Sequence, residues 1–285
     1  MTEPTTLPNE PAAAASVPAA APVQPRPALA AFALASREFV RFIRQPNRVV
    51  GAVGQPVLFW LFFGAGFHKS LQIPGSGEQN YLEYYFPGTL VLILLFTAIF
   101  TTISVIEDRR EGFLQSVLIS PIPRWSMVLG KLAGATAIAV AQGGLFLLLA
   151  LTIGVTPPWW AWLSLIGFLI LTSLALTGLG FVLAWRMDSV QGFHAVMSLF
   201  LLPLWLLSGA LFPNPAGWLA AITTVNPLTY AVAGVRRLLY ADSAAALPAN
   251  LPSLPWCVAI TAAFALLTFA ASCKVAGTRT TGDLL

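Results

Sequence analysis

Residues 107–131 read EDRREGFLQSVLISPIPRWSMVLGK, a long charged segment that lies between two strongly apolar runs. The first five residues of the segment, 107–111, all carry a charge. A charge placed in hydrocarbon costs several kcal/mol, so we expect all five to lie in water or at a headgroup surface. The segment therefore predicts a stretch of chain outside the membrane between two membrane spans.

A short amphipathic helix is predicted directly after these charges. Its apolar face has the spacing i, i+1, i+4, i+5 and consists of Phe113, Leu114, Val117 and Leu118. Pro121 and Pro123 end the helix, because proline lacks the amide hydrogen and clashes with the preceding turn. A rigid helix of this kind suits a socket on a partner protein, but on these residues alone an ordinary loop is an equal alternative.

Composition places the chain among integral membrane proteins. Of its 285 residues, 57% are hydrophobic and only 9% are charged, whereas soluble domains carry about 25% charged residues. The apolar residues come in blocks of about 20, the length that crosses hydrocarbon as a helix. A soluble all-helical core is the alternative. The net charge is +4, and the basic residues lie beside the ends of the apolar blocks. Basic residues in that position set the orientation of a membrane protein, so we expect no nucleic acid partner.

Six apolar runs predict six membrane-spanning helices. They cover residues 49–68, 86–106, 132–154, 161–184, 191–212 and 254–273. Prolines inside the first and fifth runs are tolerated, because neighbouring helices and side chains satisfy the freed carbonyls. Gly130 and Gly134 form a G-x-x-x-G pattern at the start of the third run, a spacing that allows another helix to approach closely.

The chain before the first run divides into two parts. Residues 1–27 are rich in Pro and Ala and cannot bury a core, so we expect a disordered cytosolic tail. Residues 28–48 predict an amphipathic helix in the membrane interface, with Arg37, Arg41, Arg44 and Arg48 on one side and aromatic residues on the other. A solvated helical face packed on the domain is the alternative.

The distribution of basic residues predicts the orientation. With the amino terminus inside, twelve Lys and Arg residues fall on the inner side and three, Lys69, Arg236 and Arg237, on the outer side. Basic residues mark cytosolic loops, so we expect a multi-pass protein of the inner (plasma) membrane with both termini in the cytosol. An interfacial aromatic belt is expected at the outer ends of the spans, formed by Tyr81, Tyr84, Tyr85, Trp159, Trp160 and Trp256.

Residues 213–253 require a different structure from the spans. Two apolar runs of about 10–12 residues flank Asn226–Pro227, and each is too short to cross a membrane. We expect two short helices that dip into the outer leaflet and break at this dipeptide, with their ends against protein or water. A surface loop with two amphipathic helices is the alternative.

The predicted spans lack the residues of several kinds of site. Gln55 and Gln142 are the polar exceptions near midplane depth, and His194 lies nearer the cytosolic end of its span. This argues against an ion-coupled secondary transporter and against an intramembrane hydrolase. The chain also has no G-x-x-x-x-G-K-[ST] phosphate loop, because Leu132 follows Gly130–Lys131. We expect no catalytic residue, no metal site and no bound cofactor, so energy for uphill transport must come from another polypeptide.

The 107–131 segment resembles the cytosolic loop of the ABC type-2 exporter permease family, of the drug or polysaccharide export type. The matching positions are Glu107, Arg109, Arg110, Glu111, Gly112, Ser120, Pro121, Gly130 and Lys131. A second match, AITTVNPLTYAVAGVRR at 221–237, resembles the Asn-Pro-Leu segment that precedes the last span of the family. It carries Asn226, Pro227, Leu228, Tyr230 and Arg236. The resemblance covers residues from about 28 to about 280.

The resemblance implies an all-α polytopic domain over residues 28–285, with six transmembrane helices, an amino-terminal interfacial helix and a re-entrant outer hairpin at 213–253. It implies a non-catalytic permease subunit of an ATP-driven exporter for an amphipathic drug or a lipid-linked glycan. A separate cytosolic ATPase would bind ATP and Mg, and a second permease copy would complete a homodimer among membrane lipid. The alternative is a non-transport intramembrane enzyme or an assembly scaffold.

Contacts with the ATPase are then expected in the 107–131 segment. The expected residues are Glu107, Arg109, Arg110, Glu111, Gly112, Phe113, Leu114, Ser120 and Pro121.

Overall fold

A computed structural model describes residues 26–67, 81–211, 217–242, 247–248 and 250–278. All regular structure in these ranges is helical, which confirms the predicted all-α class. Residues 1–25 of the predicted tail lie outside the described residues. The end of that predicted tail is wrong by one residue, because Pro27 already begins a helix at the position where proline is best tolerated.

Two helices replace the single amphipathic helix expected over 28–48. Helix α1 is Pro27–Ile43 and α2 is Pro46–Phe67. The chain breaks between them because Pro46 has no amide hydrogen to continue the hydrogen bonding of α1. Arg48 therefore belongs to α2 and not to the predicted interfacial helix.

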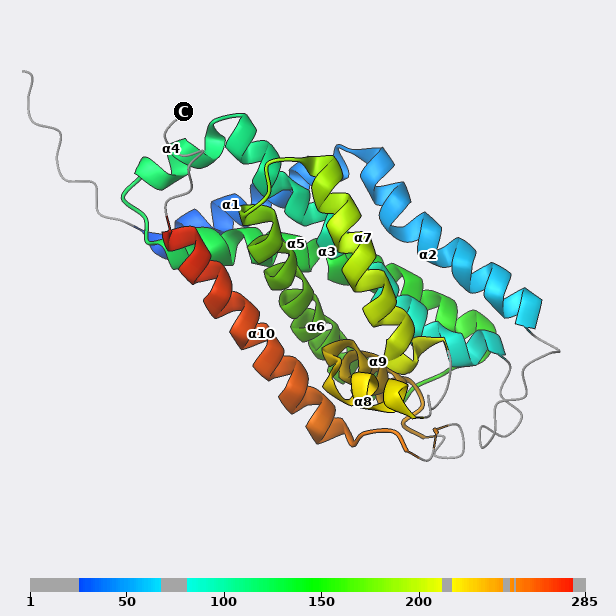
Figure 1. Cartoon of the computed structure of the whole chain (residues 1–285). Coiled ribbons are helices and arrows are strands. Elements are labelled where there is room, and N and C mark those ends of the chain that lie inside the picture. Colours follow the sequence, from blue (N-terminus) through cyan, green and yellow to red (C-terminus); the bar gives the residue numbers. More distant parts are fainter. Residues whose placement is uncertain (1–25, 68–80, 212–216, 243–246, 249, 279–285) are drawn as a thin grey trace, which may run out of the picture.

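Helix α3, Tyr81–Arg110, is the central helix of the bundle (Figure 1). Its most apolar stretch is 89% buried, compared with 22% for α10, Leu254–Gly277. The helix extends beyond the predicted run 86–106 at both ends, and four of the five charged residues that begin the 107–131 segment lie in its last turns. Those charges are therefore part of the helical bundle and do not form a separate loop.

The remaining elements follow the expected order. They are α4 (Phe113–Ile119), α5 (Arg124–Leu147) with the 3-10 turn η1 (Leu148–Ile153), α6 (Trp159–Trp185), α7 (Val190–Trp205) with the π-turn η2 (Leu206–Ala210), α8 (Trp218–Val225) and α9 (Pro227–Leu239). Helices α1 and α4 and the carboxyl end of α10 lie at one end of the bundle, and α8 and α9 lie at the other (Figure 1).

Five of the described helices are long and apolar enough to cross a membrane: α3, α5 with η1, α6, α7 with η2, and α10. The number rises to six if the bent pair α8–α9 is counted as one span. Helix α2 is not in this set, although its 22 residues reach about 33 Å, enough to cross hydrocarbon. A polytopic membrane fold is thus confirmed, and the assignment of the first predicted span to α2 stays a prediction.

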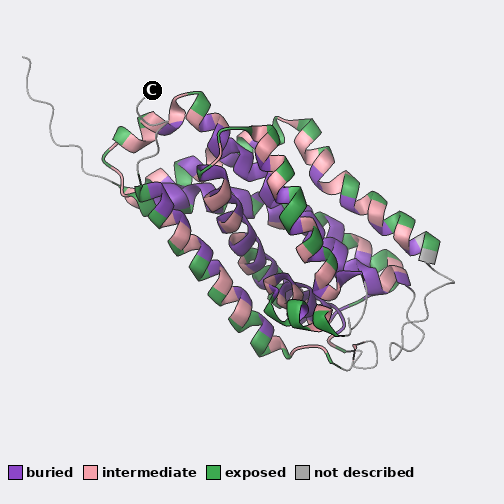
Figure 2. Cartoon of the chain, in the orientation of Figure 1, coloured by how far each residue is buried: buried purple, intermediate pink, exposed green. Residues whose placement is uncertain are grey.

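The bundle presents large apolar side chains outward, as a membrane protein must. Exposed residues follow one another along the outer helices (Figure 2), including Phe62, Leu163, Leu199, Phe200 and Leu266. The three tryptophans of the expected aromatic belt, Trp159, Trp160 and Trp256, are also exposed. The tyrosines of that belt do not fit the expectation.

Tyr81, Tyr84 and Tyr85 are buried in the core, so the prediction that they belong to the aromatic belt is wrong. They lie on α3, which the other helices surround, and their rings pack against one another. The hydroxyls of Tyr81 and Tyr84 donate to the carbonyls of Leu211 and Gly209, at 3.0 and 3.2 Å. Buried tyrosine hydroxyls usually find such partners, but that of Tyr85 has none among the residues that the structure describes.

The G-x-x-x-G pattern of α5 is the surface on which α1 packs. A Cβ atom added at Gly130 would lie 2.6 Å from the carbonyl oxygen of Ala31, and one added at Gly134 would lie 2.8 Å from that of Ala35. Backbone atoms cannot move aside as a flexible side chain can, so these glycines permit the close approach predicted from their spacing.

Gly134→Val is expected to lower stability by about 1–3 kcal/mol or more, because the added atoms overlap the backbone of α1. Gly144→Val is the matched control on the same helix, since nothing lies within 4 Å of its added Cβ. Thermal unfolding of the detergent-solubilised chain measures both. Equal melting temperatures for the two variants would contradict the close packing of α1 on α5.

Candidate functional site

Two groups of polar residues mark the opposite ends of α3. Asp108 lies near its carboxyl end and Tyr84 near its amino end. A separation of 24 residues along a helix corresponds to about 36 Å, roughly the thickness of a membrane with its interfaces. One group therefore lies at each side of the predicted membrane.

The first group, which we call the charge cluster, joins four helices. Its members are Arg37, Glu38 and Arg41 of α1, Arg48 of α2, Glu107 and Asp108 of α3 and Lys131 of α5, with Glu111 following α3. The cluster holds four cationic and four anionic side chains, so their formal charges balance.

Asp108 is the centre of the charge cluster. Its carboxylate is fully buried and accepts hydrogen bonds from Arg37 Nη2 at 2.8 Å and Arg41 Nη1 at 2.6 Å. Lys131 Nζ also donates to it and, at 2.8 Å, to the buried carboxylate of Glu38. Buried ions are tolerated when they are paired and hydrogen-bonded in this way. The expectation that all five charges at 107–111 face water is therefore wrong for Asp108.

The edge of the cluster is more exposed. Arg41 Nη2 donates to Glu107 at 2.9 Å and to Glu111 at 3.2 Å, and Arg48 also binds Glu107. Burial would lower the pKa of the Arg37 guanidinium, but the hydrogen bond and charge of Asp108 outweigh it and raise that pKa. Arg37 thus stays charged beside the carboxylate of Asp108.

Helix α1 has the amphipathic character predicted for it, with its arginine side turned toward the protein. Arg37 and Arg41 are directed into the charge cluster, and Arg44 is exposed. Leu29, Phe32 and Ile43 point away from the bundle and are exposed. The apolar side is then available to the acyl boundary, in keeping with the predicted interfacial position.

Arg109 and Arg110 connect α3 to the turn between α6 and α7. Arg109 donates to Asp188 at 3.1 Å and to the carbonyl of Trp185, and its guanidinium lies 5.5 Å from the centroid of the Trp185 ring. Arg110 donates to the carbonyl of Asp188. These two predicted coupling residues therefore bind within their own chain.

Helix α4 is the predicted short helix, and its start depends on Gly112. The φ angle of Gly112 is 75°, in the left-handed region, and nothing lies within 4 Å of an added Cβ. Gly112 thus serves a tight turn and not a close approach. Glu111 lies in that turn, directly before the helix.

The faces of α4 separate the remaining predicted coupling residues. Leu114 is buried, and the guanidinium carbon of Arg37 lies 3.6 Å from the centroid of the Phe113 ring. Ser120 donates to the carbonyl of Val117 at 2.6 Å and completes the helix end. The outer side, which we call the α4 surface, consists of Glu111, Ser116, Ile119, Pro121 and Trp125, all exposed. Ile119 is 85% exposed.

The second group lies in the outer hairpin formed by α8 and α9, which bend by 77° at Asn226. Asn226 Nδ2 donates to the carbonyl of Leu204 at 2.6 Å, and its Oδ1 accepts the amide hydrogen of buried Leu228 at 3.0 Å. Asparagine is a favoured helix cap and proline a favoured first helical residue. The predicted break at Asn226–Pro227 is confirmed, and its depth in the membrane stays a prediction.

Arg236 and Tyr230 complete this hairpin. Tyr230 donates its hydroxyl to the carbonyl of Thr224 at 2.7 Å. Arg236 is only 3% exposed, and its Nη2 donates to the carbonyl of Tyr84 at 3.0 Å. Its guanidinium carbon lies 4.0 Å from the centroid of the Tyr84 ring. Sequence reasoning missed Tyr84, because a tyrosine at the end of a span also fits an aromatic belt.

These features define a polytopic helical membrane protein with ion pairs at one end of the bundle and the α8–α9 hairpin at the other (Figure 1). The sequence model of the ABC-2 type transporter family matches residues 30–240. The chain therefore belongs to the ABC-2 type transporter family, as the resemblance implied, and is a membrane transport permease.

Named relatives agree with this membership. The chain is 30% identical over 216 residues to a putative transport permease, ycf38, of Cyanophora paradoxa, covering 74% of each chain. It is 28% identical over 162 residues to the probable multidrug ABC transporter permease YbhR of Escherichia coli K12, covering 53% of this chain and 42% of the relative. Nodulation protein J of Rhizobium leguminosarum bv. trifolii is 27% identical over 167 residues, covering 58% and 63%.

Proposed function

We propose that this chain is the membrane-spanning subunit of an ATP-driven exporter of the inner (plasma) membrane. It binds a separate cytosolic ATPase through the α4 surface and is itself non-catalytic. The observation that carries the proposal is the exposure of Ile119 on the short helix α4. The opposite side of α4 packs against the bundle through buried Leu114 and through Phe113, which contacts Arg37. The exposed Ile119, Pro121 and Trp125 together give the α4 surface an apolar character, and exposed apolar patches mark protein-binding sites.

The charge cluster offers a mechanical route from α4 into the bundle. Movement of α4 reaches α1 through Phe113 and Arg37, and it reaches α3 and α5 through Asp108 and Lys131. Because these ions are buried, separating them is costly, so the helices move together. In this account Glu107, Arg109 and Arg110 transmit the movement, whereas Glu111 and Ile119 contact the ATPase.

A homodimer forms the pathway in this proposal. The most apolar stretch of α3 is 89% buried, so the centre of one bundle is filled with side chains. A pathway for a large solute then lies on the surface of a bundle and is completed by a second copy. The single chain provides half of it.

The proposed cargo is an amphipathic molecule. One relative is named a probable multidrug permease, which supports a hydrophobic drug. A lipid-linked glycan is the other class implied by the resemblance. The outward apolar residues of α6, α7 and α10 favour cargo that enters from the lipid.

Purification of the full chain from its native membranes tests this function. We expect a soluble chain with a Walker motif to co-purify, and the complex in vesicles to hydrolyse ATP and move cargo outward. A chain that exports cargo with no ATPase bound, or that has no ATP-dependent transport with one, would refute the proposal.

Cysteine labelling tests the orientation. In a background with Cys257→Ala and Cys273→Ala, an impermeant maleimide is expected to label Asn250→Cys in intact cells, because this exposed residue lies at the outer end. Ser116→Cys on the α4 surface should react only after permeabilisation. Labelling of Ser116→Cys in intact cells would reverse the orientation.

A further inference from the structure

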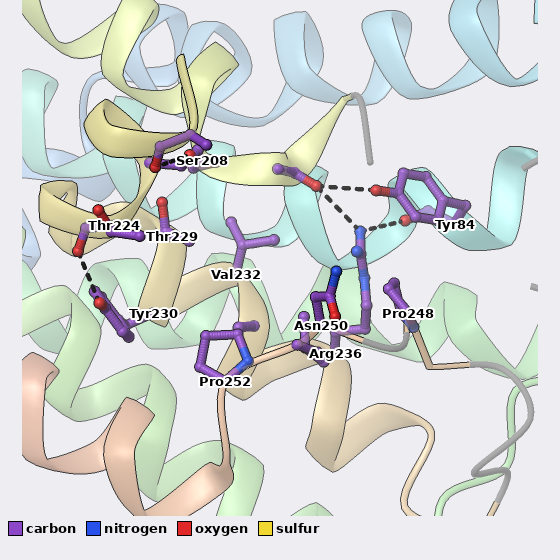
Figure 3. Close-up of a pocket in the computed structure, with 15 residues that line it drawn as sticks. Tyr84, Ser208, Thr224, Thr229, Tyr230, Val232, Arg236, Pro248, Asn250 and Pro252 are labelled. Carbon is purple, nitrogen blue, oxygen red and sulfur yellow. Dashed lines mark hydrogen bonds between the residues drawn. The ribbon is translucent and has the colours of Figure 1, made fainter. Parts of the chain in front are cut away.

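The outer hairpin encloses a pocket of 270 Å³ beside Arg236. Its polar lining comes from α9, α8 and the segment before α10, and includes Thr224, Thr229, Tyr230 and Asn250 (Figure 3). Val232, Leu251 and Pro252 add apolar surface. The pocket therefore combines a cation and hydrogen-bonding groups with apolar walls.

Arg236 is buried without a counterion among the residues that the structure describes. Every ion pair found there involves other basic residues. The contacts of its guanidinium are two carbonyl oxygens, of Tyr84 and Gly209, and the Tyr84 ring. None of these carries a negative charge, so no carboxylate of the described residues pairs directly with Arg236, although the charge of Glu83 acts together with that of Arg236 on nearby Tyr240.

The guanidinium also has hydrogen-bonding capacity to spare. An arginine carries five N–H donors, and both hydrogen bonds that Arg236 makes to described residues come from Nη2, at 3.0 and 3.5 Å. Its Nε is buried and has no partner. A buried donor left unpaired is unfavourable, so the guanidinium has donor capacity that a water molecule or a ligand can satisfy.

A second unpaired group lies on the same face of α9. The hydroxyl of Thr229 is buried without a hydrogen-bond partner, and Thr229 precedes Arg236 by seven residues, or two helical turns. Val232 and Ala233 lie between them on that face and also line the pocket. Two residues that each carry an unsatisfied polar group thus line one pocket.

We propose that this pocket binds the anionic headgroup of an amphiphile, a phosphate or a carboxylate, against Arg236. The planar guanidinium matches both groups through paired hydrogen bonds. The volume of 270 Å³ admits such a headgroup, and the pocket is partly open, so a tail can extend outside it. This inference goes beyond the proposed function, because binding requires neither ATP nor export.

The test uses dodecyl phosphate added to the purified full chain in a neutral maltoside detergent. We expect a saturable rise in the melting temperature of the wild type and none with dodecyltrimethylammonium. Arg236→Gln should weaken dodecyl phosphate binding about tenfold or more, as expected for loss of charge-assisted hydrogen bonds. Arg236→Lys, which keeps the charge, should weaken it less.

Arg186→Gln is the matched control, since it removes the same charge from an exposed position away from the hairpin. It should leave the response to dodecyl phosphate unchanged. Without added amphiphile, Arg236→Gln should melt at or above the temperature of the wild type, because it removes a buried charge with which no described carboxylate pairs directly. Equal responses of the wild type and Arg236→Gln, or no response of the wild type, would overturn the proposal.

The source of the headgroup is identified by mass spectrometry of molecules that co-purify with the chain from its native membrane. A phospholipid retained by the wild type and lost in Arg236→Gln assigns the pocket to bilayer lipid. A different anionic amphiphile with the same dependence assigns it to cargo. Either identity supports the proposal, whereas the same molecules retained by both proteins would contradict it.

Discussion

Asp108→Asn is expected to destabilise the folded chain by about 3–5 kcal/mol, the cost of removing one partner from a buried ion pair. The carboxylate is fully buried and is the shared acceptor for Arg37, Arg41 and Lys131. Without it, three cations lie close together with too few counterions. We expect little folded protein in the membrane and a large fall in melting temperature.

A second substitution separates this electrostatic cost from a change of shape. Lys131→Met removes one of the stranded cations, so Asp108→Asn with Lys131→Met should be more stable than the sum of the two single effects predicts. Glu111→Gln is the control, because the Glu111 side chain is 59% exposed and exposed ion pairs contribute little.

Thermal unfolding of the detergent-solubilised variants measures these effects. We expect a large fall in melting temperature for Asp108→Asn, a partial recovery of the melting temperature in the double variant and almost no change for Glu111→Gln. A melting temperature for Asp108→Asn close to that of the wild type would show that the charge cluster does not hold α1, α3 and α5 together.

Features determined by neighbouring residues could be predicted from the sequence. Pro121 and Pro123 end α4, Gly112 provides its left-handed turn, and Asn226–Pro227 breaks the outer hairpin. In each case the cause lies within a few residues of the effect, in a missing amide hydrogen or a helix cap. The all-α polytopic class follows equally from the length of the apolar runs.

Features determined by packing between distant helices could not be predicted. The pairs that join α1 and α2 to α3 and α5 in the charge cluster lie 59 to 93 positions apart, and Arg236 reaches a carbonyl 152 positions away. The spacing of the arginines predicted an amphipathic α1. Periodicity indicates which residues share one face of a helix, but it does not indicate which other helix packs against that face. For this reason Asp108 was expected in water and Tyr84 in an aromatic belt.

Ile119→Asp is expected to abolish coupling to the ATPase while leaving the permease folded. Ile119 is 85% exposed and has no packing role in the chain to lose. A carboxylate buried at a protein interface without a partner is strongly unfavourable, and truncating a central interface residue typically costs about 2 kcal/mol or more, over tenfold in affinity. Glu111→Lys should act in the same direction by reversing a charge on the same surface.

Thr156→Asp is the control for an added carboxylate. Thr156 is exposed in the segment between η1 and α6, at the end of the bundle opposite α4. The Thr156→Asp variant should keep normal abundance, should still co-purify with the ATPase and should support normal ATP hydrolysis.

Cargo-stimulated ATP hydrolysis by the purified complex, compared between the wild type and Ile119→Asp at equal permease abundance, tests coupling through the α4 surface most directly. We predict that Ile119→Asp loses this stimulation and releases the ATPase during purification, whereas Thr156→Asp keeps both. Full stimulation and full ATPase retention in Ile119→Asp and in Glu111→Lys would contradict the assignment of the α4 surface to the ATPase.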